Sequence, residues 1–157
     1  MTFKEAVRQT PDLETAWQPG LQALRAEDKP HIKPEDPRLL SGSADVDSAL
    51  MPKEPQANRW DFAIGYRHTN RKDEFIYWVE THTGSDAQIK VVLKKLEWLK
   101  TWMRGDGRRL GQFDRDIVWV SSGRTLFTKG SAQVKLLAQK GLIYAGAVLR
   151  IPCQRRS

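Results

Sequence analysis

The sequence predicts an α/β domain in which a mixed β-sheet is flanked by helices. Three observations support this: two aromatic and β-branched strand segments, one long amphipathic helix, and an apolar run typical of a central strand. The expected order is α-β-β-β-α-β-α-β, which is typical of one mixed sheet with helices packed on its faces. The predicted elements are a helical region at 3–26, strands at 39–47, 59–66 and 74–82, a helix at 85–104, a strand at 116–121, a helix at 131–140 and a strand at 147–151.

The first third of the chain gives the weaker signals. Apolar residues at helical spacing indicate helix over 3–26, with Thr10-Pro11-Asp12 as a restart and Pro19-Gly20 as a break. Residues 27–38 carry prolines among charged residues, and residues 51–58 also contain prolines. Both segments are therefore predicted to be irregular connectors.

The middle of the chain gives the clearest signals. Residues 59–66 and 74–82 are rich in strand-forming side chains, and the polar link between them suits a hairpin. The helix at 85–104 has Ser85 as a candidate N-cap. Its buried stripe is predicted from apolar residues that recur at helical spacing: Ile89, Val92, Leu93, Leu96, Leu99 and Met103.

The last third of the chain predicts a β-α-β unit. Residues 116–121 are continuously apolar, which favours a central strand. The helix at 131–140 ends before Gly141, and the strand at 147–151 follows. Residues 152–157 are expected to form a frayed tail.

Length and composition fit a single domain in a reducing compartment. The 157 residues form one predicted domain, 1–157, and the single cysteine, Cys153, excludes a disulfide within the chain. No apolar run approaches the ~20 residues that span a bilayer, and the N-terminus lacks the apolar stretch of a secretory signal. We therefore expect a cytoplasmic protein that does not enter the membrane.

The net charge of +7 is unevenly distributed. Residues 1–58 carry 7 Lys/Arg and 10 Asp/Glu, whereas residues 59–157 carry 19 and 9. A basic field of this strength favours polyanionic partners such as nucleic acid or an acidic protein. Alternatively, the basic charge only keeps the protein soluble. Charge alone therefore does not distinguish a polyanion-binding protein from a merely soluble one.

Two acidic residues interrupt the apolar strands. Asp61 lies in Trp-Asp-Phe, and Glu80 lies in Trp-Val-Glu-Thr. A carboxylate between large apolar groups is partly desolvated and is rarely left without a basic neighbour or a bound cation. If 59–66 and 74–82 pair as a hairpin, both acids can lie on the same side of it. Two adjacent carboxylates repel unless a proton or a divalent ion lies between them, and such oxygen ligands suit Mg²⁺ or Mn²⁺.

A second acidic pair, Asp45 and Asp47, falls at alternate positions of the predicted strand 39–47. Alternation places both side chains on one face of that strand. They either join Asp61 at a metal, with Asp47 as an additional ligand, or face water at a sheet edge.

The element order and these acids resemble the PD-(D/E)XK nuclease-like superfamily. That pattern has an initial helix, three strands with an Asp on the second and a Glu-x-basic triplet on the third, a helix, and a further β-α-β. The resemblance covers nearly the whole chain in element order, although its local motifs are short. It implies a restriction-endonuclease-like fold, a metal-binding Asp61, and Glu80 as the acid of the triplet. Glu14 corresponds either to a further helix-borne acid of the family or to solvated helix surface.

His82 stands where this family has its catalytic lysine. The resemblance implies that this group orients the attacking water and stabilises charge developing on the phosphate. A histidine can act as a base near neutral pH or donate a hydrogen bond when protonated. Alternatively, Lys90 or Lys94 of the following helix reaches back to the carboxylates. Gln88 and Lys95 on that helix either face a substrate or form its ordinary surface.

The resemblance therefore implies a Mg²⁺- or Mn²⁺-dependent nuclease in which the two acids and either His82 or Lys94 carry out the chemistry. Lys90, Lys94, Arg108 and Arg109 are expected to contact phosphates. The alternative is a catalytically inactive module on the same fold that binds nucleic acid or a partner protein in a larger bacterial complex, and the histidine in place of lysine favours it. A structural subunit without nucleic-acid contact is a third alternative.

The chain is also similar to a set of small bacterial proteins that share three short patterns: Gly-Ser…Asp-x-Asp, Arg-Trp-Asp and Val-Glu-x-His. This likeness implies no activity.

Overall fold

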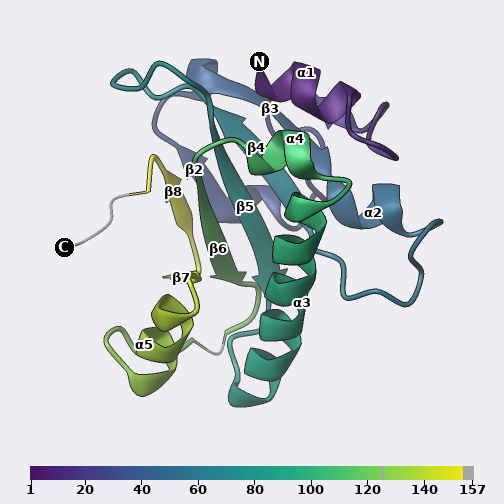
Figure 1. The fold of residues 1–157 in the computed structure, drawn as a ribbon. Coiled ribbons are helices and arrows are strands. Elements are labelled where there is room, and N and C mark those ends of the chain that lie inside the picture. Colours follow the sequence, from purple (N-terminus) through teal and green to yellow (C-terminus); the bar gives the residue numbers. More distant parts are fainter. Residues whose placement is uncertain (125, 154–157) are drawn as a thin grey trace.

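A mixed sheet and five α-helices form most of the structure, a computed structural model that describes residues 1–124 and 126–153 (Figure 1). The helices are α1 (Phe3–Arg8), α2 (Val46–Leu50), α3 (Asp86–Arg104), α4 (Arg108–Gly111), α5 (Ala132–Gln139) and the 3₁₀ turns η1 (Lys29–His31) and η2 (Pro37–Leu39). The strands are β1 (Trp17–Gln18), β2 (Ile32–Pro34), β3 (Leu40–Asp45), β4 (Phe62–Tyr66), β5 (Phe75–His82), β6 (Arg115–Ser121), β7 (Ile143–Gly146) and β8 (Leu149–Ile151).

The main sheet is mixed, as the sequence predicted, with the strand order β1-β3-β4-β5-β6-β7. The strands β3, β4 and β5 are antiparallel, whereas β5, β6 and β7 are parallel. The register aligns Phe62 of β4 with Val79 of β5. Asp61 directly precedes Phe62 and Glu80 directly follows Val79, so the register brings the two acids to adjacent positions.

The two faces of the main sheet have different covers. Within the described residues, each of the five α-helices contributes buried side chains to the cluster on one face, and none contributes to the cluster on the other. The second face is covered by the connector between β1 and β3, residues 19–39, and by Leu149 and Ile151 of β8. This connector contributes Leu24 and Ile32, and its part predicted to be irregular, 27–38, also contains the short strand β2, the 3₁₀ turn η1 and most of η2. The predicted helical cover is thus present on one face. On the other, a connector rich in proline takes its place, because proline lacks the N–H donor that a helix interior needs.

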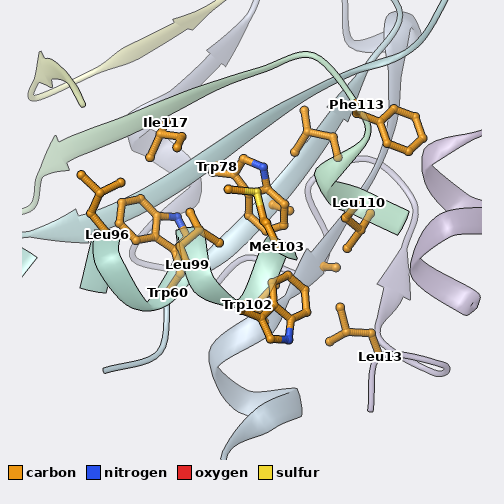
Figure 2. Packing of buried hydrophobic residues seen from close by; sticks show 14 of the residues in the cluster. Leu13, Trp60, Trp78, Leu96, Leu99, Trp102, Met103, Leu110, Phe113 and Ile117 are labelled. Atoms are coloured by element: carbon orange, nitrogen blue, oxygen red, sulfur yellow. The ribbon is translucent and has the colours of Figure 1, made fainter. Parts of the chain in front are cut away.

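Large aromatic side chains fix α3 against the sheet (Figure 2). Trp78 of β5 and Trp102 of α3 meet edge to face with ring centroids 5.9 Å apart, and Trp98 stacks on Trp102 at 5.7 Å. Leu96 and Leu99 are completely buried in the same cluster. Because this packing is dense, side chains on the buried line of α3 have a fixed position relative to β5.

The predicted helix at 3–26 is wrong beyond Arg8. The Thr10 hydroxyl donates to the carbonyl oxygen of Ala6 at 2.7 Å, Pro11 has no N–H, and Asp12 adopts a left-handed φ of 68°. Residues 13–26 form turns and the short strand β1 instead. The apolar residues on which the prediction rested are nevertheless buried, as Leu13 and Leu24 are, or half-buried, as Trp17 and Leu21 are. The apolar spacing thus identified core residues correctly but predicted the wrong secondary structure for them.

Two predicted strands also differ from the structure. The strand expected at 39–47 ends at Asp45, because the Asp45 carboxylate accepts the N–H of Ser48 at 2.9 Å and caps α2. The prediction that Asp45 and Asp47 share one strand face is therefore wrong. The last strand of the main sheet is β7, which the sequence did not predict, and the strand expected at 147–151 is β8, paired with β2.

The remaining elements lie close to their predicted bounds, and residues 51–58 are irregular as expected. Of the predicted tail, Pro152 and Cys153 are described, and the Cys153 N–H donates to the Tyr77 hydroxyl at 3.2 Å. Residues 154–157 lie outside the described residues. Among the described helices, none combines the length and apolar character needed to cross a membrane.

Candidate functional site

Asp61 and Glu80 are in direct contact. The backbone N–H of Asp61 donates to Oε1 of Glu80 at 3.2 Å. Asp61 is 7% exposed and Glu80 is completely buried. Both acids have their side chains on the face of the sheet that α3 covers, and ionised groups so deeply buried require positive charge nearby.

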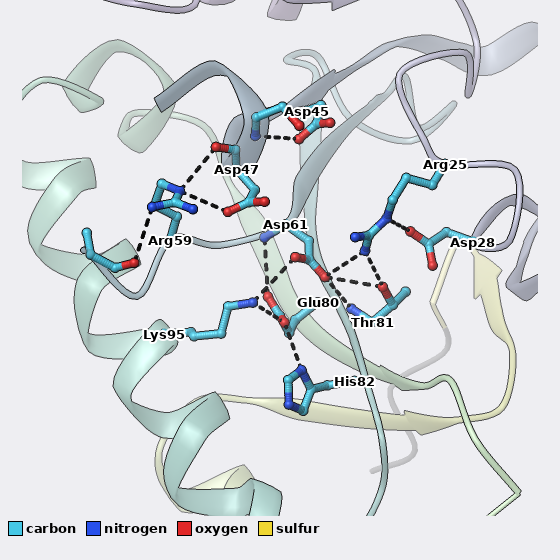
Figure 3. A network of polar contacts seen from close by, with 12 residues as sticks. Arg25, Asp28, Asp45, Asp47, Arg59, Asp61, Glu80, Thr81, His82 and Lys95 are labelled. Carbon is cyan, nitrogen blue, oxygen red and sulfur yellow. Dashed lines mark hydrogen bonds and ion pairs between the residues drawn. The ribbon is translucent and has the colours of Figure 1, made fainter. Parts of the chain in front are cut away.

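Lys95 of α3 supplies that charge (Figure 3). Its Nζ lies 3.4 Å from Oδ1 of Asp61 and is in contact with Oε2 of Glu80. The Lys95 side chain is itself only 14% exposed. A single ammonium group therefore compensates both carboxylates.

The position of Lys95 on α3 explains why it, rather than Lys94, reaches the acids. Residues separated by three or four positions lie on one line of a helix, and such a line runs through Gln88, Val92, Lys95, Leu99 and Trp102. The exposed Lys90 and Lys94 lie off this line. The prediction that Lys90 or Lys94 reaches the carboxylates thus needs correction to Lys95. The signal was present in the sequence as a lysine on the apolar line.

The second carboxylate oxygen of Asp61, Oδ2, has partners other than Lys95. It accepts the N–H of Thr81 at 3.0 Å and the Thr81 hydroxyl at 3.2 Å. Nη2 of Arg25 lies 3.5 Å from the same oxygen. Arg25 lies in the turns between β1 and η1, within the segment 3–26 that was predicted to be helical, so no pattern in the sequence pointed to its contact with Asp61.

His82 faces oxygen atoms at both ring nitrogens. Its Nδ1 lies 3.5 Å from Oε2 of Glu80, and its Nε2 lies 2.5 Å from Oε1 of Gln88. The hydrogen bond with Glu80 raises the pKa of His82, although burial opposes the shift. Two oxygen neighbours favour the doubly protonated ring. His82 is thus arranged to donate to Glu80 rather than to accept a proton from water.

Burial raises the pKa of Glu80 to about 7. The hydrogen bond with His82 acts against burial, whereas the Asp61 charge adds to the rise, and Lys95 again lowers it. Glu80 therefore exchanges its proton near neutral pH, and any additional cation beside it would favour the ionised form.

The other predicted acids do not join the carboxylate pair. The Asp47 carboxylate is paired with Arg59, with Nε and Oδ1 2.9 Å apart. Asp45 and Asp47 line, with Asp61 and Arg25, a small cavity of about 60 Å³. Glu14 is exposed in the turns that follow α1. The predicted role of Asp47 as a metal ligand would require it to leave Arg59.

Arg108 and Arg109 lie in α4, far along the sheet from Glu80. The chain enters β6 four residues after α4, and Arg115 at the start of β6 aligns with Ile76 at the start of β5 (Figure 1). Glu80 lies toward the other end of β5. The structure therefore does not bring this arginine pair to the carboxylates.

A cavity of about 870 Å³ lies at the same far end, and both aromatic residues such as Tyr66 and Phe75 and charged residues such as Asp36 and Arg115 line it. We place the candidate site at the acids, because paired buried carboxylates that share a lysine have a defined chemistry.

The donor set of the acids fits a hard divalent cation. Oδ1 of Asp61 and Oε2 of Glu80 already converge on one cationic group, the Lys95 ammonium. Mg²⁺ typically takes one or two carboxylates and keeps several waters, so two acids are a sufficient protein contribution. Within the described residues, no group of three or more His, Cys, Asp and Glu side chains is arranged to hold a metal ion.

Comparisons of the chain with protein-family models, curated proteins and solved structures find no match. The residues of the site are therefore the basis of the function proposed below.

Proposed function

We propose that this chain is a metal-dependent nuclease-like protein with a restriction-endonuclease-like fold that acts on nucleic acid. The observation that supports this most is the convergence of Asp61, Glu80 and Lys95. Asp61 directly precedes β4, Glu80 lies in the adjacent strand β5, and the lysine comes from the following helix α3. These are the residue types that the family resemblance requires, with Lys95 in the role of the triplet lysine.

The proposed chemistry assigns a task to each group. When bound, Mg²⁺ or Mn²⁺ would polarise the scissile phosphate and lower the pKa of the attacking water. Asp61 and Glu80 would hold the ion. The Lys95 ammonium, beside both acids, stabilises negative charge that develops on the phosphate oxygens. The Thr81 N–H fixes the orientation of the Asp61 carboxylate.

Nucleic acid is the proposed substrate class because of charge. Residues 59–157 carry 19 Lys/Arg against 9 Asp/Glu. Lys90 and Lys94 are exposed on α3, the helix that bears Lys95, which supports a role for them in contacting phosphates.

The test of this proposal is cleavage of end-labelled DNA and RNA by purified protein in Mg²⁺ or Mn²⁺. We expect Asp61→Asn and Glu80→Gln each to lower the rate by ~100-fold or more, because each removes a negative oxygen ligand from the proposed ion site. Lys72→Met, in the exposed loop between β4 and β5, is the matched control and should cleave as the wild type does. Robust cleavage by both acid variants, purified in parallel, would refute the proposal.

One observation favours a second function, a catalytically inactive module that binds nucleic acid or a partner protein. All four carboxylate oxygens of Asp61 and Glu80 already have a hydrogen-bond or ion-pair partner. Their charges are thus compensated without a metal. Such a module would bind in a salt-sensitive, metal-independent way that Asp61→Asn does not change. Isothermal titration calorimetry that detects heat from the binding of a divalent ion would count against this second function.

A further inference from the structure

Arg25 is the most exposed of the charged side chains that contact Asp61 and Glu80. Its side chain is 50% exposed, against 27% for His82 and 14% for Lys95. A ligand that approaches the nearly closed carboxylate pair from solvent can therefore meet this guanidinium first.

The guanidinium of Arg25 is held in one orientation. Its Nε donates to Oδ2 of Asp28 at 2.8 Å, and the Asp28 side chain is only 4% exposed. Its Nη2 donates to the Thr81 hydroxyl at 3.2 Å. The hydrogen bond that Arg25 donates to Asp28 raises the pKa of Arg25, so the group is permanently charged. An arginine fixed at two points loses little freedom when it binds a ligand.

Donors of Arg25 remain available beside Asp61. A guanidinium has five N–H donors, and its Nη1 has no hydrogen-bond partner within residues 1–124 and 126–153. Figure 3 shows Arg25 and Lys95 on opposite sides of the Asp61 carboxylate. Two cations that flank a metal-binding acid form a clamp for a tetrahedral anion.

We propose that Arg25 binds a non-bridging oxygen of the substrate phosphate at the Asp61–Glu80 site, and that Asp28 is the positioning residue that aims its guanidinium. This rests on the proposed nuclease function. It makes the connector between β1 and β3, which covers the opposite face of the sheet from α3, a part of the active site.

The charges predict when Arg25 binds phosphate. The charges of Asp28, Asp61 and Glu80 are offset by those of Arg25, Lys95 and the protonated His82, so without a divalent ion an incoming phosphate meets no net positive charge. A divalent ion held by the acids makes the local charge positive. Phosphate binding through Arg25 is therefore expected to depend on the divalent ion.

The test compares the kinetics of Mg²⁺-dependent cleavage of an end-labelled oligonucleotide by wild type, Arg25→Ala, Arg25→Lys and Asp28→Asn. We expect Arg25→Ala to lower kcat/KM by ~100-fold and to reduce the slope of log kcat/KM against log salt by about one, the effect of one lost phosphate contact. Millimolar guanidinium should restore part of the Arg25→Ala rate, which a merely structural role would not allow. Arg25→Lys should remain impaired because lysine cannot reproduce the fork of donors.

Asp28→Asn should lower kcat/KM without changing the salt slope, because the phosphate contact persists in a less favourable geometry. Arg150→Gln, an exposed charge on β8, is the matched control. Should Arg25→Ala fail to fold, Arg25→Lys decides.

Wild-type kinetics in either folded Arg25 variant would overturn the assignment of Arg25 while leaving the nuclease proposal intact. Absence of cleavage by the wild type itself would instead overturn the nuclease function, and the Arg25 proposal with it.

Discussion

We expect Lys95→Met to lower kcat for divalent-ion-dependent cleavage by ~10²–10³-fold, the usual cost of removing one charge-stabilising group from an active site. Methionine keeps most of the length and the helix propensity of lysine but has no ammonium group. The variant therefore removes the one cation that contacts both Asp61 and Glu80. The measurement is single-turnover cleavage of an end-labelled oligonucleotide at a temperature where circular dichroism shows the variant to be folded.

Two control substitutions, Lys94→Met and Lys72→Met, test whether this result is specific to Lys95. Lys94→Met is expected to raise KM and leave kcat unchanged, because Lys94 is exposed and off the buried line of α3. Lys72→Met controls for the loss of one positive charge elsewhere. A larger loss of kcat in Lys94→Met than in Lys95→Met would contradict the assignment of the catalytic lysine.

The Lys95→Met substitution should also destabilise the metal-free protein by about 3–5 kcal/mol. This is the range for breaking a buried ion pair by removing one partner. The loss should depend on pH. Glu80 has a native pKa of about 7, above the ordinary value of 4.5. The native state thus binds more protons than the unfolded chain between these values, so stability falls as pH rises through this window. Removing Lys95 should raise the pKa of Glu80 further, so the fall in stability should continue to higher pH. The stability lost by Lys95→Met should therefore be smallest near the acid end of the window.

Urea unfolding of Lys95→Met, Glu80→Gln and the double variant tests the predicted loss of stability. The buffer contains a chelator that removes divalent ions. The double variant should recover about 0.5–3 kcal/mol relative to the sum of the single losses, because the glutamine carries no charge that needs a cation. A loss in Lys95→Met of only about 0–1 kcal/mol, as for an exposed ion pair, would show that the ammonium is not compensating buried charge.

The acids could be found from the sequence because their surroundings made them costly. Asp61 and Glu80 interrupt runs of large apolar residues, and the hairpin that contains them was predicted from strand propensity alone. The contact of Lys95 with the acids could also have been predicted from the sequence. A lysine between Val92 and Leu99 on the apolar line of a helix must either extend to solvent or pair with an acid. Here it pairs with both Asp61 and Glu80.

Other parts of the site could not be predicted from pattern. Arg25 lies in turns that the apolar spacing of 3–26 suggested to be helix, and its contact with Asp61 depends on the path of the connector between β1 and β3. Asp45 illustrates a competition between two local rules. Alternation favoured a strand through Asp47, but the preference of aspartate for the N-cap position ended the strand and began α2.

We propose that Asp61 and Glu80 form a divalent-ion site that Lys95 completes. X-ray diffraction from crystals soaked in Mn²⁺ tests it most directly, through the anomalous signal of the metal. We predict an anomalous peak between Oδ1 of Asp61 and Oε2 of Glu80, with the Lys95 ammonium moved away from Glu80 and still near Asp61. The absence of such a peak, with Lys95 still bridging both carboxylates, would contradict the claim.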